Sequence, residues 1–298
     1  MHHFLEISPL SREHIESLIK RALEFKQQKK FPSYSQHTVA NLFYENSTRT
    51  RVSFELAAQH LSMRVVNLDL QNSSESKGEV IEDTIQTLAA MGIQNFVIRH
   101  KQEGLQQKLA NNLGNAVHIV NAGDGTHAHP SQAILDIMTI IEQKSQLNKL
   151  KIAVLGNIKH SRVANSFQHI CSKLGVGELV LIAPEVWQPQ KTLSYGRVTS
   201  NLKDGLTDAD VVICLRVQRE RLLETEHLDL ESYRRDFALT KISLAYAKPD
   251  AMVMHPGPMN RRVEIDSDVA DGPQSFILQQ VTNGVYARMA ILESLIKS

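Results

Sequence analysis

The sequence has little of several features that mark specialised classes of protein. Only two of its 298 residues are cysteines, Cys171 and Cys214, which is too few for a disulfide framework and lacks the spacing of a metal site. Lys and Arg together number 33, against 32 for Asp and Glu. The overall charge therefore gives no sign of a nucleic-acid partner, and any anion site must come from local clustering of basic residues.

Long hydrophobic runs are also missing. No apolar stretch approaches the length of a membrane span, and the first residues do not resemble a signal peptide. Hydrophobic residues make up 42% and charged residues 22% of the chain, which fits one large or two medium globular domains at this length. We therefore expect a soluble, cytoplasmic protein with no membrane or nucleic-acid partner.

Short runs rich in β-forming residues alternate with helical patterns along the chain. The runs predict strands at residues 40–44, 64–68, 95–99, 116–120, 152–155, 179–182, 211–215 and 252–254. Apolar residues at helical spacing predict helices at residues 11–30, 80–91, 104–113, 130–143 and 274–296. Such alternation is typical of parallel sheets, whose strands are connected by helices.

The pattern restarts after a polar stretch at residues 142–149. We therefore predict an α/β fold with two doubly wound parallel-sheet domains that are bridged by helices. The first domain is expected at residues 1–135 and the second at residues 136–273. The C-terminal helix, about residues 274–298, is expected to pack back on the first domain.

The stretch that follows the first predicted strand has the clearest chemical pattern. Ser47-Thr48-Arg49-Thr50-Arg51 comes directly before a helical run. With Ser47 as the N-cap, the next three backbone amides would be donors without a partner in the helix. Free amides beside hydroxyl and guanidinium groups suit a phosphate. The alternative is an ordinary capped helix with solvated arginines.

Ligands of open parallel sheets bind beyond the carboxyl ends of the strands. Here those ends are followed by Arg99-His100, Gly123 to Gln132, Gly156 to Arg162, Arg216 to Gln218, and His255 to Pro258. Four arginines at strand ends of a nearly neutral protein predict a small substrate system rich in negative charge. Taken singly, Arg99 is as well explained by an ion pair at a sheet edge, and His129 by a structural hydrogen bond.

Two other patterns at these ends favour neither a metal nor a nucleotide. His127-x-His129 has no obvious third ligand for a metal. Gly156 to Ser161 stands where a dinucleotide fingerprint would, but it lacks the second and third glycines of that motif. We therefore predict no metal and no nicotinamide cofactor.

Several extended motifs together resemble the aspartate and ornithine carbamoyltransferase family, and its aspartate-specific catalytic chains in particular. They occur in the same order as in the family and cover nearly the whole sequence. The motifs are Ser47 to Glu55, Ser73-x3-Lys77-Gly78-Glu79, Val97 to His100, His129 to Asp136, Lys159 to Val163, Arg216 to Arg221, His255 to Arg261, and Asn283 to Met289.

The resemblance implies a reaction and a set of site residues. The carbamoyl group of carbamoyl phosphate would pass to the amine of L-aspartate, giving N-carbamoyl-L-aspartate and phosphate in de novo pyrimidine biosynthesis, without a cofactor. The first domain would bind carbamoyl phosphate and the second aspartate. The residues implied for carbamoyl phosphate are Ser47, Thr48, Arg49, Thr50, Arg99, His129, Gln132, Gly257 and Pro258. Those implied for aspartate are Lys77, Arg162, Arg216 and Gln218, and the catalytic ones are Arg49, Thr50, Lys77, Arg99 and His129.

The resemblance also implies partners. Ser73 and Lys77 would reach into the site of a neighbouring subunit, so that a homotrimer is the smallest active unit. Whether a regulatory chain or a dihydroorotase associates with it stays open. Two departures from the family pattern are small: Asn46 stands where proline is usual, and Ser131 replaces a common threonine.

Two alternative functions compete with carbamoyl transfer to aspartate. Ornithine carbamoyltransferase shares the Ser-Thr-Arg-Thr-Arg loop, but it typically has His-Cys-Leu-Pro where this chain has His255-Pro256-Gly257-Pro258. It also binds a cationic amino group, whereas Arg216-Val217-Gln218 suits a carboxylate. A non-catalytic phosphate- or amino-acid-binding relative would be expected to have lost Lys77, Arg99 or His129, which are all present. Aspartate is the favoured substrate.

Overall fold

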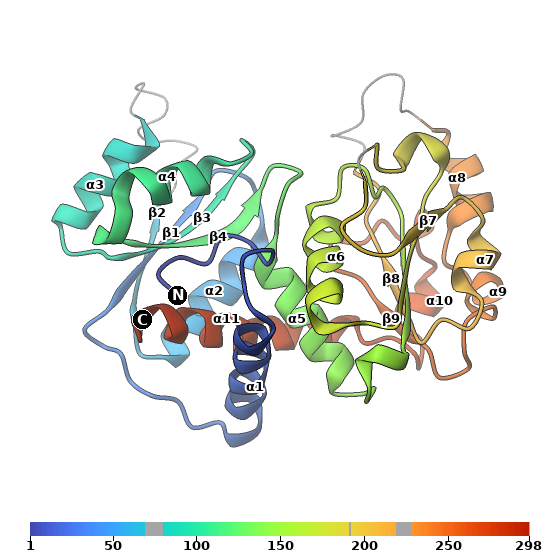
Figure 1. Cartoon of the computed structure of the whole chain (residues 1–298), viewed down its shortest axis with the longest axis horizontal. Coiled ribbons are helices and arrows are strands. Elements are labelled where there is room, and N and C mark those ends of the chain that lie inside the picture. Colours follow the sequence, from blue (N-terminus) through green and yellow to red (C-terminus); the bar gives the residue numbers. More distant parts are fainter. Residues whose placement is uncertain (69–79, 191, 219–227, 298) are drawn as a thin grey trace. The chain divides into compact units, whose positions relative to one another are not determined.

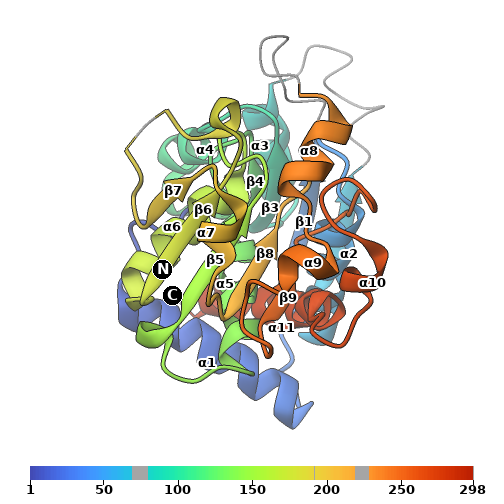
Figure 2. The same ribbon diagram turned by 90° about the vertical axis from the view of Figure 1, so that its right-hand side faces the viewer.

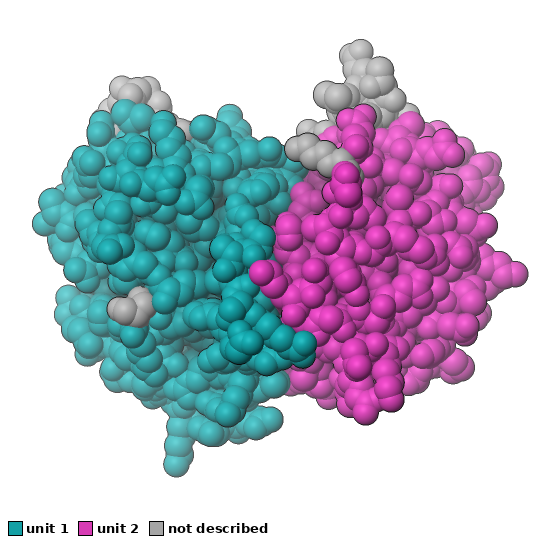
Figure 3. All heavy atoms as spheres, viewed as in Figure 1, with its two compact units in different colours: residues 1–138, 282–298 teal, residues 139–281 magenta. Residues whose placement is uncertain are grey.

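The chain divides into two compact units (Figure 3). The structure, a computed structural model, describes residues 1–68, 80–190, 192–218 and 228–297. Unit 1 comprises residues 1–138 and 282–298, and unit 2 comprises residues 139–281. The chain passes from unit 1 to unit 2 within the helix Pro130–Ile141 and returns within the helix Ile277–Ile296. None of the helices formed by the described residues is long and apolar enough to cross a membrane.

Unit 1 is built on one parallel sheet. Its elements are α1 (Arg12–Gln28), β1 (Thr38–Phe43), α2 (Thr48–His60), β2 (Arg64–Leu68), α3 (Ile81–Ala90), β3 (Asn95–His100), α4 (Leu105–Leu113), the 3-10 turn η2 (Gly114–Ala116), β4 (His118–Asp124), most of α5 (Pro130–Ile141) and the larger part of α11 (Ile277–Ile296). The strand order is β2-β1-β3-β4, and all neighbours are parallel. Helices α3 and α4 cover one face of this sheet, and α2 lies on the other (Figure 1).

The core of unit 1 follows the two-residue period of its strands. Leu42 and Ile98 pair in register and belong to one buried cluster with Ile85 of α3 and Leu109 of α4. Full burial of each such aliphatic side chain stabilises the fold by about 1.5–3 kcal/mol. The sheet is thereby held firmly enough to fix the loops at its carboxyl edge.

Unit 2 repeats this plan with a larger sheet. Its elements are η3 (Leu147–Lys149), β5 (Lys151–Leu155), α6 (Arg162–Leu174), β6 (Glu178–Ile182), η4 (Glu185–Trp187), β7 (Arg197–Thr199), α7 (Leu202–Leu206), β8 (Val211–Cys214), α8 (Leu230–Phe237), α9 (Lys241–Leu244), β9 (Met252–Met254) and α10 (Ser267–Ala270). The strand order is β7-β6-β5-β8-β9, again all parallel (Figure 2).

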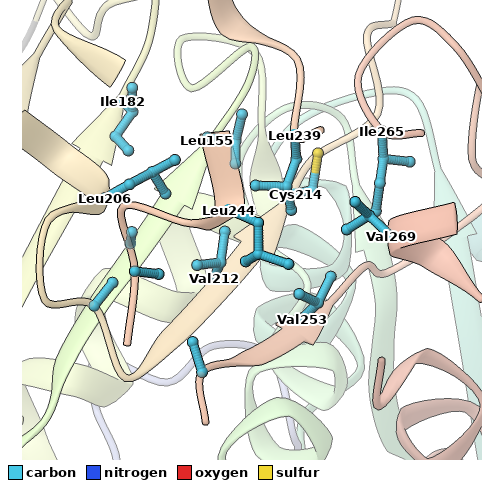
Figure 4. Packing of buried hydrophobic residues seen from close by; sticks show 14 of the residues in the cluster. Leu155, Ile182, Leu206, Val212, Cys214, Leu239, Leu244, Val253, Ile265 and Val269 are labelled. Atoms are coloured by element: carbon cyan, nitrogen blue, oxygen red, sulfur yellow. The ribbon is translucent and has the colours of Figure 1, made fainter. Parts of the chain in front are cut away.

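One face of the unit 2 sheet is covered by a continuous apolar cluster (Figure 4). Leu155 and Val212 project from the central strands toward Leu206 of α7 and Leu244 of α9. Cys214, at the end of β8, is fully buried in the same cluster. Burial raises the pKa of its thiol well above the usual value, so Cys214 serves as a small apolar side chain here.

The predicted fold class is confirmed, because both units contain an all-parallel sheet with helices between the strands. The predicted helix at residues 11–30 appears as α1, and Ser11 caps it by accepting a hydrogen bond from the His14 amide at 3.2 Å. Every predicted strand has a counterpart in one of the two sheets. Buried strands of this kind are readable because parallel sheets leave little polar surface on them.

The predicted strand at residues 116–120 is wrong at both ends, since β4 covers His118–Asp124. Ala116 ends a 3-10 turn instead. The strand continues through polar residues because the N-terminal segment pairs beside it: the Phe4 amide donates to Ile119 O and the Asn121 amide donates to Phe4 O, both at 2.8 Å. Pairing between segments so distant in the chain produces no pattern in the local sequence from which the strand end could be predicted.

Two features of unit 2 differ from the prediction, an additional strand and the start of the last helix. The edge strand β7 was not predicted, because it has only three residues and none is fully buried. The last helix begins at Ile277 rather than at residue 274. Gln274 instead accepts a hydrogen bond from the Val253 amide at 2.7 Å, so the segment before the helix extends the edge of the sheet.

Candidate active site

The start of α2 forms the most exposed part of the candidate site in unit 1. Ser47 stands at the N-cap position, as predicted, but its side chain accepts no hydrogen bond from the first turn. The first helical bond runs from the Arg51 amide to Ser47 O at 3.1 Å. Thr48 and Arg49 are exposed to solvent, whereas Thr50 is buried. The hydroxyl groups and the first amides therefore stand at a helix N-terminus, where a phosphate is favoured.

Arg99 lies at the carboxyl end of β3, in register with Phe43 at the end of β1. Its Nε is 3.3 Å from a carboxylate oxygen of Glu45, and its Nη1 donates to Ala122 O at 3.3 Å. Strand β3 is an inner strand of the sheet. The ion pair that was the alternative explanation for Arg99 is therefore present. It does not lie on an outer strand, however, but at the carboxyl end of an inner strand, where the loops of the candidate site begin.

His129 and Gln132 stand at the beginning of α5. Pro130 occupies the first helical position, where a missing amide hydrogen costs nothing. Both His129 and Gln132 are buried. The Gln132 side-chain amide donates to a carboxylate oxygen of Asp136 at 2.8 Å, one turn further along the helix. That bond fixes the amide plane, so that its carbonyl oxygen has a defined direction.

A buried arginine supports this part of the site, and the sequence motif gave no role for it. The Arg288 guanidinium donates to Gly284 O at 3.0 Å, lies 3.5 Å from the Ser131 hydroxyl and stacks on the Phe54 ring at 5.0 Å. Burial lowers its pKa to about 10, although the Asp136 carboxylate acts in the opposite direction. Arg288 thus ties α11 to the two helices that begin at the site, α2 and α5.

In unit 2, Arg162 is the first residue of α6. Ser161 caps that helix by accepting a hydrogen bond from the Ala164 amide at 3.1 Å. The loop before it passes close to the loop after β8, because a Cβ at Gly156 would lie 2.9 Å from Leu215 O. Gly156 also has a φ of +134°, which side chains rarely adopt. Glycine at this position brings the segment that leads to Arg162 beside Leu215, the residue before Arg216.

Arg216 and Gln218 follow β8 and are half-buried, on either side of the buried Val217. Val217 O accepts a hydrogen bond from the Asn260 side-chain amide at 3.1 Å. Gly257, after β9, donates its amide to Nδ1 of His255 at 2.8 Å. The loops after β8 and β9, which contain the predicted aspartate and carbamoyl residues of this unit, are therefore joined by hydrogen bonds.

The structure thus gathers the predicted residues into two sets, each at the carboxyl edge of one sheet. The set in unit 1 offers hydroxyls, helix amides, guanidinium groups and an imidazole, and the set in unit 2 offers two guanidinium groups and an amide. Ser73 and Lys77 lie outside the described residues. Among the residues that the structure describes, no three His, Cys, Asp or Glu side chains are grouped as a metal site requires.

Two parallel α/β units with basic and hydrogen-bonding side chains at their strand ends define a class of α/β protein whose strand ends suit small anionic ligands. Family models match both halves of the chain: the carbamoyl-P binding domain of aspartate/ornithine carbamoyltransferases at residues 2–142, and their Asp/Orn binding domain at residues 148–295. The chain belongs to the aspartate/ornithine carbamoyltransferase family.

Individual relatives agree with this assignment. The chain is 78% identical to the aspartate carbamoyltransferase catalytic subunit of Legionella pneumophila (strain Corby), over 100% of both chains. It is 48% identical to that of Coxiella burnetii (strain Dugway 5J108-111), over 98% of this chain and 95% of the relative. Its fold matches aspartate transcarbamoylase from Trypanosoma cruzi in complex with N-(phosphonacetyl)-L-aspartic acid, with a TM-score of 0.89, 28% identity and coverage of 98% of this chain and 95% of the other. The predicted resemblance to the aspartate-specific chains is confirmed.

Proposed function

We propose that this chain transfers the carbamoyl group of carbamoyl phosphate to the amine of L-aspartate, giving N-carbamoyl-L-aspartate and phosphate. The observation that carries the choice of aspartate is the segment after β8. There Arg216 and Gln218 flank Val217, whose backbone amide and carbonyl oxygen are both hydrogen-bonded. The backbone from which the Arg216 and Gln218 side chains extend is therefore held in place. A guanidinium group binds a carboxylate in a bidentate manner, whereas the side-chain amino group of ornithine would be repelled by it.

Carbamoyl phosphate is proposed to bind to the residues of unit 1. Ser47, Thr48, Arg49 and Thr50 hold the phosphate, which is supported by their place at the N-terminus of α2. The carbamoyl group is held by Arg99, His129 and Gln132. Their support is the placement of all three at the carboxyl edge of one sheet. The backbone groups of Gly257 and Pro258 are proposed to contribute to the same substrate.

Aspartate is proposed to bind through Arg162, Arg216 and Gln218 of unit 2. Arg162 begins α6 and Arg216 follows the neighbouring strand β8, so both lie at one edge of the sheet. Two guanidinium groups match the two carboxylates of aspartate and leave its amine as the group that can react. Much of the rate enhancement is then due to orientation of that amine.

In the reaction, the lone pair of the aspartate amine attacks the carbamoyl carbon. Negative charge develops on the carbonyl oxygen, and Thr50, Arg99 and His129 are donors suited to it. Removal of one such donor costs about 3–4 kcal/mol of transition-state stabilisation. The bond from carbon to the phosphate oxygen then breaks, and the departing phosphate takes the proton that the amine loses. No covalent intermediate with the protein is needed.

The active assembly is proposed to be a homotrimer in which Ser73 and Lys77 act in a neighbouring subunit's site. Lys77 would help to bind aspartate and to stabilise the transition state. Association with a regulatory chain is also proposed. It is supported by the relatives, which are named catalytic subunits.

The reaction is tested by measuring the ureido product and phosphate together, with carbamoyl phosphate and aspartate as substrates. We expect equal amounts of both, formed only when aspartate is present. In the variant Arg49→Gln, the KM for carbamoyl phosphate should rise at least about tenfold, because a charge-assisted bond to the phosphate is lost. Phosphate release that does not depend on aspartate would contradict the proposal.

A further inference from the structure

Glu264 is a buried carboxyl group that the proposed mechanism does not use. It has no exposed surface, and its backbone is fixed to the core of unit 2. Its carbonyl oxygen accepts hydrogen bonds from the Leu239 amide at 2.9 Å and from the Cys214 thiol at 3.2 Å. The next residue, Ile265, belongs to the apolar cluster in which Cys214 and Leu239 also lie (Figure 4). The position of Glu264 is therefore set by the core.

The carboxylate of Glu264 faces groups from two segments, the loops after β8 and β9. Its Oε2 accepts from the Val217 amide at 3.4 Å. Its Oε1 accepts a hydrogen bond from the backbone amide of Asn260 and lies 3.3 Å from Nε2 of His255. Nδ1 of His255 accepts a hydrogen bond from the Gly257 amide, so Nε2 is the nitrogen that carries a ring hydrogen. A carboxylate fits this place because it is purely an acceptor.

These contacts converge on Val217. Its side chain is buried, its amide is held by Glu264 and its carbonyl oxygen is held by Asn260. Because Val217 lies between Arg216 and Gln218, a fixed Val217 backbone also fixes the points from which both neighbouring side chains extend. The Glu264 carboxylate is thus one of the groups that tie the loop after β8 to the core, together with the Asn260 side chain and the buried Val217 side chain.

We propose that Glu264 is a positioning residue for aspartate binding, which acts by holding the Arg216–Gln218 segment in place. The proposal rests on the proposed binding of aspartate by Arg216 and Gln218. Glu264 itself does not touch the substrate. Its loss should therefore change the KM for aspartate much more than the KM for carbamoyl phosphate or kcat.

The variant Glu264→Gln tests this with little change in shape. The glutamine carbonyl oxygen can replace Oε1 toward Asn260 and His255, but its NH2 group then faces the Val217 amide, and two donors meet. We expect the KM for aspartate to rise at least about tenfold, since small displacements of binding groups have effects of up to 10²-fold. The KM for carbamoyl phosphate and kcat should change less than about threefold.

Asn260→Ala provides a second route to the same result, because it removes the other bond to the Val217 backbone. It should raise the KM for aspartate in the same way. Asp210→Asn is the matched control. Asp210 is also a buried carboxyl group that accepts a backbone amide, from Lys151 at 2.9 Å, but it stands before β8, at the opposite end of the strand. This variant should leave the KM for aspartate unchanged.

The outcomes separate this inference from the proposed function. If the wild-type chain carbamoylates aspartate and Arg216→Lys raises its KM, an unchanged aspartate KM in both Glu264→Gln and Asn260→Ala overturns the positioning role alone. Equal changes in both KM values and kcat, together with a lowered unfolding temperature, would show a merely structural role and also overturn it. A wild-type chain that does not use aspartate overturns the proposed function itself.

Discussion

Arg216 and Arg49 are both proposed to bind anionic oxygens, but their surroundings differ. Arg49 is exposed at a helix N-terminus, whereas Arg216 is half-buried beside a fixed backbone. A half-buried guanidinium group can hold both oxygens of a carboxylate in one geometry, and an ammonium group cannot. The difference makes Arg216 the better place to test substrate specificity.

We predict that Arg216→Lys raises the KM for aspartate by about 10- to 100-fold and leaves the KM for carbamoyl phosphate within about twofold, because a bidentate pair becomes a single charge contact. Steady-state kinetics with each substrate varied in turn provides the measurement. An equal rise in both KM values would contradict the assignment of Arg216 to aspartate.

At the scale of residues, the sequence indicated the groups at strand ends but not the buried groups behind them. Arg49, Arg99 and His129 were predicted because they follow apolar runs. Glu264 and Arg288 carry charged side chains that are typical of a surface, and their burial depends on partners far away in the chain. No local pattern shows which charged residue will meet such partners.

Helices α11, α5 and α2 meet around Arg288, and Gly284 leaves the space for its guanidinium group. A Cβ at Gly284 would lie 2.5 Å from Nη1 of Arg288. Helix propensity alone would make Gly284→Ala stabilise the protein by about 1 kcal/mol. We predict the opposite result, a loss of about 1–3 kcal/mol, because the buried guanidinium group must move.

A double-mutant cycle with Arg288→Met measures this effect by chemical unfolding. In the Arg288→Met background, Gly284→Ala should no longer destabilise the protein, since the crowded group is gone. If the cost of Gly284→Ala is the same in both backgrounds, the space at Gly284 is not needed for Arg288.

Helices α1 and α11 are joined by Glu293, whose side chain accepts hydrogen bonds from Arg21 at 2.6 and 2.9 Å and from the Tyr34 hydroxyl at 2.8 Å. Lys297 lies 3.0 Å away. Burial raises the pKa of Glu293, but the bonds from Arg21, Lys297 and Tyr34 outweigh it and hold the pKa at about 2 instead of 4.5. The ionised carboxylate therefore stabilises the native state.

We predict that this contribution is fully present above pH 4.5 and is lost as the pH falls toward 2, because the unfolded chain takes up the proton first. Glu293→Gln should lower the free energy of unfolding by about 2 kcal/mol at pH 7. The difference between wild type and variant, measured by urea unfolding at several pH values, should shrink below pH 4.5. A constant difference down to pH 3 would contradict this role.

At the scale of elements, prediction succeeded where local patterns decide the structure and failed where distant segments do. The inner strands were found because they are continuous apolar runs. The extension of β4 and the start of α11 depend on backbone pairing with Phe4 and Val253, respectively. Strand β7 is a short edge that is stabilised by its neighbour β6 rather than by its own composition.

For the molecule as a whole, the parallel fold does not choose between the two amino acids, because the matching family model covers domains that bind either aspartate or ornithine. We propose that the choice falls to Arg162, Arg216 and Gln218, in the loops after the strands. These loops were recognisable in the sequence because their motifs are long and occur in a fixed order. Their support by Glu264 and Arg288 was visible only in the structure.

The proposed homotrimer with shared sites predicts that two inactive variants restore activity when they are combined in one trimer. Chains with Lys77→Ala and chains with Arg49→Ala should each be nearly inactive alone. If Lys77 acts in a neighbouring subunit's site, mixed trimers contain some sites with both natural residues. Activity should then appear after the two variants are dissociated, mixed and reassembled. Mixtures that stay as inactive as their parents would contradict shared sites.

The central claim is that this chain carbamoylates aspartate and not ornithine. The most direct test measures formation of the ureido product from carbamoyl phosphate by the purified chain, with aspartate and ornithine offered separately. We predict turnover with aspartate and none above background with ornithine. Turnover with ornithine alone would leave the fold and the phosphate loop as described, but it would contradict the binding of aspartate by Arg162, Arg216 and Gln218.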